Sequence, residues 1–252
     1  MPREPITIVG AGLVGSLLAA MLGQRGHAVR VFEKRPDLRC ERIPAGRSIN
    51  LALAERGLHA LRIAGLAEQV QALLIPMRGR MLHLAEGQVT YAPYGQRADE
   101  VIYSISRLEL NQLLLSAAEA TGRVELHFQA TCEQVDLARQ ELWIRDERAG
   151  HLRQEPYARV LGADGSASVL RAAIISRTGG TCRYDRLDHD YKELSIPASA
   201  GGDWQMERDA LHIWPRGGFM LIALPNRDGS FTVTLFLAHA GSPSFADLIT
   251  PT

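Results

Sequence analysis

The chain has 252 residues, of which 46% are hydrophobic, and its 28 Lys and Arg residues are balanced by 28 Asp and Glu residues. This length supports one large domain or two interleaved ones, and the balanced charge, with no basic run interleaved with aromatics, excludes the electrostatic signature of a nucleic-acid-binding protein. Three widely spaced cysteines, Cys40, Cys132 and Cys182, lack metal-ligand spacing and favour a reducing cytoplasm over a disulfide framework or a zinc site.

The sequence predicts no targeting or membrane segment. Only five residues precede the first buried-type strand, so we expect no signal peptide. The longest apolar stretch, around residues 219–225, is too short to cross a bilayer. We therefore expect a cytoplasmic protein whose partners are small molecules, while the sequence does not indicate an oligomeric state.

The N-terminal part is predicted to begin as a βαβ unit. Residues 6–9 read as a short apolar strand, residues 10–15 as a glycine turn, residues 13–23 as an Ala- and Leu-rich helix, and residues 29–33 as a second strand. Two strands joined in this way are parallel and almost always connected by a right-handed crossover. The pattern predicts a doubly wound α/β sheet.

After a polar, Arg-rich loop at 35–47, which we expect to cover a ligand, helices and strands alternate. The predicted helices cover residues 52–64, 67–74 and 107–120. Extended segments are predicted at 81–92, 101–105, 124–128, 133–137, 141–145 and 159–162. Beyond about residue 183 the β runs are broken by Pro and Gly, which predicts an antiparallel sheet with strands at 191–196, 211–214, 219–224 and 231–237.

The first glycine turn carries a dinucleotide-binding pattern, Gly10-x-Gly12-x-x-Gly15, directly after a strand and opening a helix. Gly10 permits the tight turn, Gly12 allows the backbone to approach a pyrophosphate, and Gly15 allows close helix packing. Glu33, which closes the second strand, would accept hydrogen bonds from a ribose hydroxyl. The alternative is a turn without a ligand beside a surface Glu, and the motif alone does not separate NAD from FAD.

A second glycine turn, Gly162-Ala163-Asp164-Gly165, follows a strand and precedes another helix. Asp164 could accept a hydrogen bond from a ribose or fix the turn by bonding backbone N–H groups, and Arg171 on the following helix could meet a phosphate. The alternative is an Asx-turn before an N-capped helix. Two nucleotide-type turns in one chain resemble the flavoprotein hydroxylases.

Longer segments resemble one family of these FAD-dependent aromatic hydroxylases, the kynurenine 3-monooxygenases. They lie at residues 46–57, 76–81, 93–95, 211–216 and 222–226. The resemblance implies a Rossmann-like FAD/NAD(P)-binding domain interleaved with an antiparallel β substrate domain. We expect residues 1–75 and 98–182 in the first domain, and 76–97 and 183–252 in the second.

The resemblance also implies roles for particular residues. Contacts to FAD fall on the two glycine turns and on Val14, Phe32, Glu33, Lys34, Arg35, Ala52, Arg107 and Cys132, although Cys132 stands where the family has Leu. The substrate contacts are Arg80 and Tyr94. A guanidinium offers a two-pronged match to the carboxylate of L-kynurenine, and a Tyr hydroxyl supplies a further donor. Taken alone, an Arg or Tyr in such a loop is more often a surface residue.

The reaction that the resemblance implies uses NADPH to reduce FAD, forms a flavin C4a-hydroperoxide with O2, and converts L-kynurenine to 3-hydroxy-L-kynurenine in tryptophan degradation and NAD biosynthesis. Because the cofactor carries this chemistry, no catalytic side chain and no metal are expected. We interpret His59, His83, His127 and His212 as packed or half-exposed residues. NADPH is expected as a visiting co-substrate, since no second complete glycine fingerprint is present.

Family members continue into a third flavin motif, a Gly-Asp followed by Ala-Ala-His, whereas this sequence stops at Thr252 without it. We therefore expect a truncated chain that lacks the C-terminal part of the fold. Two other functions stay open: a FAD-binding fragment without turnover, and a generic FAD-dependent reductase on the same fold.

Overall fold

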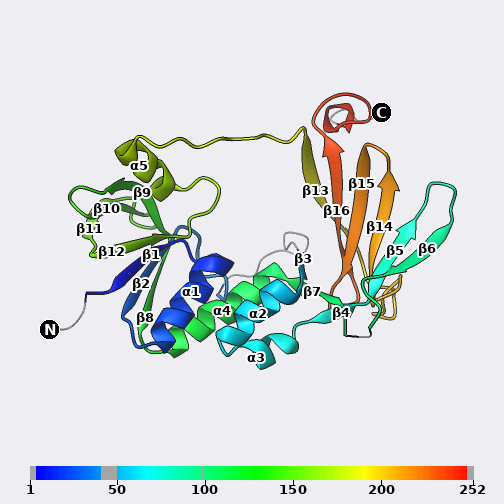
Figure 1. Cartoon of the computed structure of the whole chain (residues 1–252), viewed down its shortest axis with the longest axis horizontal. Helices are drawn as coiled ribbons and strands as arrows, with labels where there is room; N and C mark the ends of the chain where they lie inside the picture. Colours follow the sequence, from blue (N-terminus) through cyan, green and yellow to red (C-terminus); the bar gives the residue numbers. More distant parts are fainter. Residues whose placement is uncertain (1–3, 41–49, 98, 249–252) are drawn as a thin grey trace. The chain divides into compact units, whose positions relative to one another are not determined.

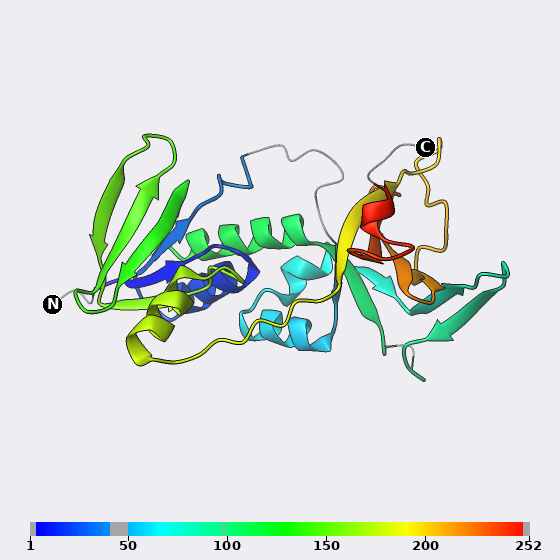
Figure 2. The same cartoon turned by 90° about the horizontal axis from the view of Figure 1, so that it is seen from above.

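The computed structural model describes residues 4–40, 50–97 and 99–248 (Figures 1 and 2). The chain divides into two compact units, one formed by Met1–Arg42 and Leu110–Tyr184, the other by Ile43–Glu109 and Asp185–Thr252. The second unit therefore includes residues 43–75 and 98–109. From the sequence, we had assigned these residues to the FAD-binding domain. The functional division of the chain stays a prediction.

The first unit is built on a four-stranded parallel sheet with the order β12-β1-β2-β8. β1 (Ile6–Val9), α1 (Leu13–Gln24) and β2 (Val29–Glu33) form the predicted βαβ unit. The outer strands are β8 (Val124–Phe128) and β12 (Arg159–Gly162). The doubly wound α/β class expected from the sequence is confirmed.

Both faces of this sheet are covered, which explains its runs of apolar residues. On one face, Ile8 and Val31 pack with Ala19 and Ala20 of α1 and with Leu115 of α4 (Arg107–Ala120). On the other face, residues of β1 and β2 pack against the antiparallel sheet of β9 (Ala130–Asp136), β10 (Glu141–Asp146) and β11 (Leu152–Pro156), and against α5 (Val169–Thr178). The sequence did not predict β11.

In the second unit, the first predicted helix begins later than expected. Residues Asn50–Leu53 form strand β3, and helix α2 covers only Glu55–Ile63. β3 pairs with β7 (Ile102–Ser106), which also pairs with β4 (Ile75–Met77). Helix α3 is correspondingly short, at Ala67–Gln71. Pairing with the distant β7 overrides the local helix propensity of the Ala- and Leu-rich segment.

A six-stranded sheet forms the rest of the second unit, with the order β13-β16-β15-β14-β5-β6. Its strands are β5 (Gly79–His83), β6 (Val89–Pro93), β13 (His189–Ile196), β14 (Ala210–Arg216), β15 (Phe219–Pro225) and β16 (Phe231–Ala238). The pairs are antiparallel as predicted, except that β14 runs parallel to β5. The chain then forms a single 3-10 turn at Phe245–Leu248.

Residues 41–49, which include part of the expected ligand-covering loop and the start of the segment 46–57, lie outside the described residues. Within the described part of the chain, none of the helices combines the length and the apolar character needed to cross a membrane.

Candidate functional site

The two glycine turns, far apart in sequence, lie against each other at the carboxyl edge of the parallel sheet. Val9 and Gly162, the last residues of neighbouring strands β1 and β12, are paired in register, and the backbone N–H of Ala163 donates to the carbonyl of Val9 at 2.8 Å. Gly10 has a φ of +96°, and a Cβ there would lie 2.4 Å from the Ala163 carbonyl oxygen. Only glycine fits this position.

The backbone at Gly12 is open, in contrast to its neighbours. A Cβ built on Gly12 would meet nothing within 4 Å, whereas one on Gly15 would lie 1.9 Å from the Gly10 carbonyl oxygen. Helix α1 begins directly after Gly12, at Leu13, so its first N–H groups lack acceptors within the helix. Open backbone at a helix N-terminus fits a pyrophosphate, which is the group that the glycine pattern predicts.

Glu33 closes β2 and is 6% exposed. Its Oε2 accepts a hydrogen bond from the Ala11 backbone N–H at 2.7 Å, and its Oε1 accepts from the Arg35 backbone N–H at 3.0 Å and from Arg35 Nε at 2.7 Å. Burial raises the pKa of Glu33, but these hydrogen bonds outweigh burial and hold the pKa below its ordinary value. The carboxylate therefore fixes the glycine turn, a role that the sequence did not predict, and its contact with a ribose stays a prediction.

Asp164 caps the helix that follows the second turn. Its Oδ2 accepts a hydrogen bond from the Val169 backbone N–H at 2.8 Å, while the Ser168 hydroxyl accepts from the Arg171 backbone N–H at 2.9 Å. The Arg171 guanidinium donates to carbonyls of its own turn, those of Gly165 and Ser166. The turn thus has the N-capped geometry that was the alternative interpretation, and a nucleotide contact by Asp164 stays a prediction.

Cys132 lies in β9. Its side chain is buried, and its Sγ lies 3.6 Å from the Gln134 carbonyl oxygen. Burial, together with the Asp164 charge, raises the pKa of the Cys132 thiol to about 11. The thiol is therefore protonated at physiological pH, consistent with a position where the family has an apolar residue.

The residues expected on the adenine side of FAD are divided between surface and core. Val14 on α1 is 71% exposed, Lys34 is exposed and Arg35 is half-buried. Phe32, in contrast, is 1% exposed, and its ring stacks on that of His127 with 5.1 Å between centroids. Because its side chain belongs to the core, Phe32 could contact a ligand only through its backbone.

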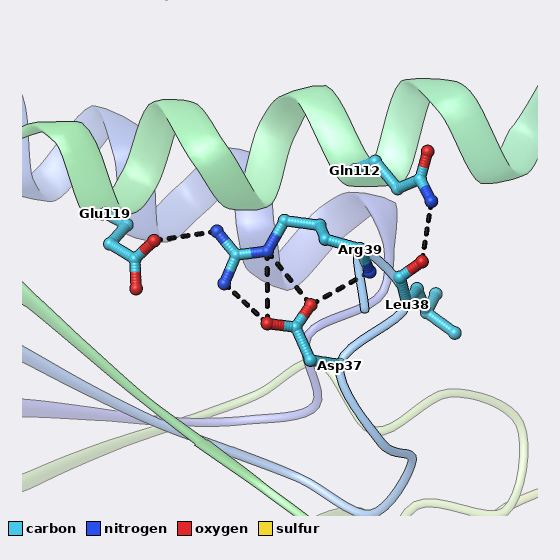
Figure 3. Close-up of polar contacts among 5 residues, drawn as sticks. All are labelled: Asp37, Leu38, Arg39, Gln112 and Glu119. Atoms are coloured by element: carbon cyan, nitrogen blue, oxygen red, sulfur yellow. Dashed lines mark hydrogen bonds and ion pairs between the residues drawn. The ribbon is translucent and has the colours of Figure 1, made fainter. Parts of the chain in front are cut away.

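The segment that follows Arg35 is tied to helix α4 (Figure 3). Asp37 forms an ion pair with Arg39, which also pairs with Glu119 on α4 at 2.8 Å. Gln112, also on α4, donates to the Leu38 carbonyl at 2.6 Å. The sequence shows the Asp-x-Arg spacing, but it does not identify the partners on the distant helix.

Two of the expected FAD contacts, Ala52 and Arg107, belong to the second compact unit. Ala52 is an exposed residue of β3 and pairs with Ser104 of β7. Arg107 is exposed and is the first residue of α4. Their contacts with FAD stay predictions.

The two expected substrate contacts, Arg80 and Tyr94, lie together. Arg80 is on β5, Tyr94 directly follows β6, and the Arg80 guanidinium carbon lies 4.2 Å from the centroid of the Tyr94 ring. Burial raises the pKa of the Tyr94 hydroxyl, and the Arg80 charge opposes this shift. The hydroxyl therefore stays protonated at neutral pH beside an exposed cation, which is a suitable arrangement for an anionic group.

The second unit also contains a polar cluster that sequence reasoning missed. The side-chain amide of Asn50 donates to Ser104 Oγ at 3.0 Å and to Asn226 Oδ1 at 2.6 Å, and Ser104 Oγ donates to the Pro225 carbonyl at 2.9 Å. These residues line a cavity of about 510 Å³. Asn50 and Asn226 both belong to segments that resemble the family, 46–57 and 222–226, and this resemblance was the only feature of the sequence that could have identified the cluster.

His212 is a core residue, 1% exposed. It lies 2.9 Å from His83 Nε2 through its Nδ1, and 2.8 Å from the Glu207 carbonyl through its Nε2. Burial lowers the pKa of His212 and of His83. This pair is packed as we interpreted it from the sequence.

Comparison with known proteins identifies relatives across nearly the whole chain. Residues 3–234 match the family described as FAD binding domain. Kynurenine 3-monooxygenase from Myxococcus xanthus is 51% identical over 249 residues, which cover 99% of this chain and 54% of that protein. Kynurenine 3-monooxygenase from Xanthomonas axonopodis is 48% identical over 244 residues, 97% of this chain and 53% of the relative. The chain spans about half the length of the curated relatives it matches.

Solved structures share the fold. PqsL from Pseudomonas aeruginosa, in complex with 2-aminobenzoylacetate, has a TM-score of 0.69 at 19% identity. The superposition covers 94% of this chain and 61% of the PqsL chain. The flavin-dependent monooxygenase PieE, in complex with FAD and substrate, has a TM-score of 0.73 at 18% identity. The superposition covers 97% of this chain and 45% of the PieE chain.

Proposed function

Since the chain belongs to the FAD-binding domain family, we propose that it supplies the FAD-binding and substrate-binding residues of an NADPH-dependent flavoprotein monooxygenase that hydroxylates L-kynurenine. The substrate follows from the names of relatives about half identical to this chain. The main structural support for FAD as the cofactor is that the two glycine turns lie against each other. At Gly12, the backbone at the start of α1 has free space beside it in which a ligand can bind.

In this proposal, the N-terminus of α1 binds the pyrophosphate of FAD, and Glu33, beside Lys34 and Arg35, binds the adenine side. Glu33 also holds the Ala11 peptide, so the turn is formed before the ligand arrives. When bound, FAD would supply the oxygen transfer to the substrate after reduction by NADPH. The chain's own residues bind and orient both molecules.

Arg80 and Tyr94 are proposed to bind the α-carboxylate of L-kynurenine. The contact between the two side chains holds the guanidinium over the aromatic ring. A charge-assisted pair with Arg80 and a hydrogen bond from the neutral Tyr94 hydroxyl would fix one end of the substrate. The electron-rich aniline ring needs only to be oriented toward the flavin, so this proposal requires no nucleophilic side chain.

The test has two parts. The purified chain should bind FAD, measured by flavin fluorescence, and its failure to do so would overturn the proposal. A chimera in which this chain replaces the matching segment of the Myxococcus xanthus relative should form 3-hydroxykynurenine from kynurenine, NADPH and O2. A chimera that binds FAD and oxidises NADPH at a rate independent of kynurenine would instead identify a generic reductase.

A second candidate function is FAD binding without turnover by this chain alone. The FAD-binding residues proposed above all lie on this chain, which spans about half the length of the curated relatives it matches. Comparing the isolated chain with the chimera separates the two candidates, because a FAD-binding fragment binds the flavin but forms no hydroxylated product.

A further inference from the structure

We propose that Asn111, a residue to which no role was assigned above, positions the glycine turn for the pyrophosphate of FAD. Asn111 lies on α4 and is 4% exposed. Its side-chain amide donates to the Ala11 carbonyl and to Ser16 Oγ, each at 3.1 Å. This inference rests on the proposed function, because it assigns Asn111 to the same FAD site.

Asn111 acts on the turn by two routes. The direct route is its bond to the Ala11 carbonyl. The second runs through the hydroxyl of Ser16, which is fully buried on α1 and donates at 2.7 Å to the Gly12 carbonyl, a carbonyl that also accepts the Ser16 backbone N–H at 2.9 Å. The amide of Asn111 therefore holds the Ala11 carbonyl directly and supports the Gly12 carbonyl, which is also held by the backbone of α1, through Ser16.

The direction of these carbonyls decides what the turn presents to a ligand. In a trans peptide the C=O and the following N–H point in opposite directions. When the Ala11 carbonyl is held toward Asn111, the Gly12 N–H must point away from α4, and fixing the Gly12 carbonyl orients the Leu13 N–H in the same manner. These are N–H groups of the kind that bind phosphate at helix N-termini.

Glu33 completes the arrangement from another element. Its carboxylate holds the Ala11 N–H, so both polar groups of Ala11 are bonded to side chains, one from β2 and one from α4. Without Asn111, the Ala11 carbonyl would lose its partner and could rotate toward the pyrophosphate, where a carbonyl oxygen repels negative charge. Asn111 is thus a positioning residue, which acts on the ligand through the backbone.

The variant that tests this is Asn111→Leu, which has a similar shape and no hydrogen-bond donor. We expect the Kd for FAD to rise about five- to tenfold, because a buried carbonyl loses its donor. ADP, which carries the pyrophosphate without the flavin, should lose affinity by the same factor. Gln112→Leu is the matched control, because Gln112 is the next residue of α4 and its amide bonds the Leu38 carbonyl, away from the turn.

The melting temperature of the apoprotein separates positioning from simple packing. If Asn111 only stabilises α4, Asn111→Leu lowers this temperature and leaves both Kd values unchanged, which would overturn the inference. If Asn111→Leu does not fold, Ser16→Ala tests the second route and should raise the Kd for FAD about two- to fivefold; an unchanged Kd would again overturn it. Failure of the unaltered chain to bind FAD would instead overturn the proposed function itself.

Discussion

The carboxylate of Glu33 accepts a hydrogen bond from the backbone N–H of Ala11, 2.7 Å away and 22 residues earlier in the chain. The Glu33 side chain, at the end of the second strand, therefore holds the first glycine turn in place. The sequence predicted a different role for it, a contact with the ribose of the cofactor. Replacing Glu33 should consequently affect both the protein without ligand and its affinity for FAD.

We expect Glu33→Ala to weaken FAD binding by about 1–3 kcal/mol, the range for removing a buried charged hydrogen-bonding partner. Titration of the apoprotein with FAD measures this change. Glu125→Ala is the matched control, because Glu125 lies on the neighbouring strand β8 with its side chain 78% exposed. An FAD affinity that is unaffected by Glu33→Ala would place Glu33 outside the site.

The depressed pKa of Glu33 predicts a pH dependence of stability. A carboxylate whose pKa is lower in the folded than in the unfolded state stabilises the fold above the ordinary pKa of 4.5, and this contribution is lost as pH falls through the folded-state value. The unfolding free energy of the unaltered chain should therefore decrease more steeply below about pH 4.5 than that of Glu33→Gln. Denaturant titrations between pH 3 and 7 measure the two slopes, and equal slopes would contradict the prediction.

Arg80→Ala should remove the partner of the kynurenine carboxylate. Loss of such a charge-assisted pair costs on the order of 2–5 kcal/mol, so kcat/KM for kynurenine in the chimera should fall at least about 30-fold. FAD affinity should hardly change, because Arg80 is assigned to the substrate. Arg97→Ala, a change at an exposed Arg of the same unit, is the control. Normal kynurenine kinetics or loss of FAD in Arg80→Ala would show that the assignment is wrong.

The thiol of Cys132 should react far more slowly with an alkylating reagent at pH 8 than those of Cys40 and Cys182. Cys132 is buried with a pKa raised to about 11, whereas the other two side chains are exposed. The thiolate is the reactive form, so both burial and the raised pKa slow the reaction. Mass spectrometry of peptides after timed labelling gives the three rates, and rapid labelling of Cys132 in the folded protein would contradict the structure.

The sequence by itself determined the parts of the fold that depend on local patterns. The order of strand, glycine turn, helix and strand from Ile6 to Glu33 follows from residue periodicity and glycine spacing, and the structure reproduces it. The positions of Gly10 and of the second glycine turn were also correct, because turn chemistry depends on a few consecutive residues.

Only the tertiary structure decided the relationships between residues far apart in the chain. Pairing with β7 extended strand β3 (Asn50–Leu53) into residues 52–53, which the sequence predicted as the start of a helix. The bond from Asn111 to the Ala11 carbonyl and the contact of Arg80 with Tyr94 each require two segments to be brought together by the sheet and helices around them. Local propensity and spacing describe neighbours in sequence, whereas these contacts depend on how the whole chain buries its apolar faces.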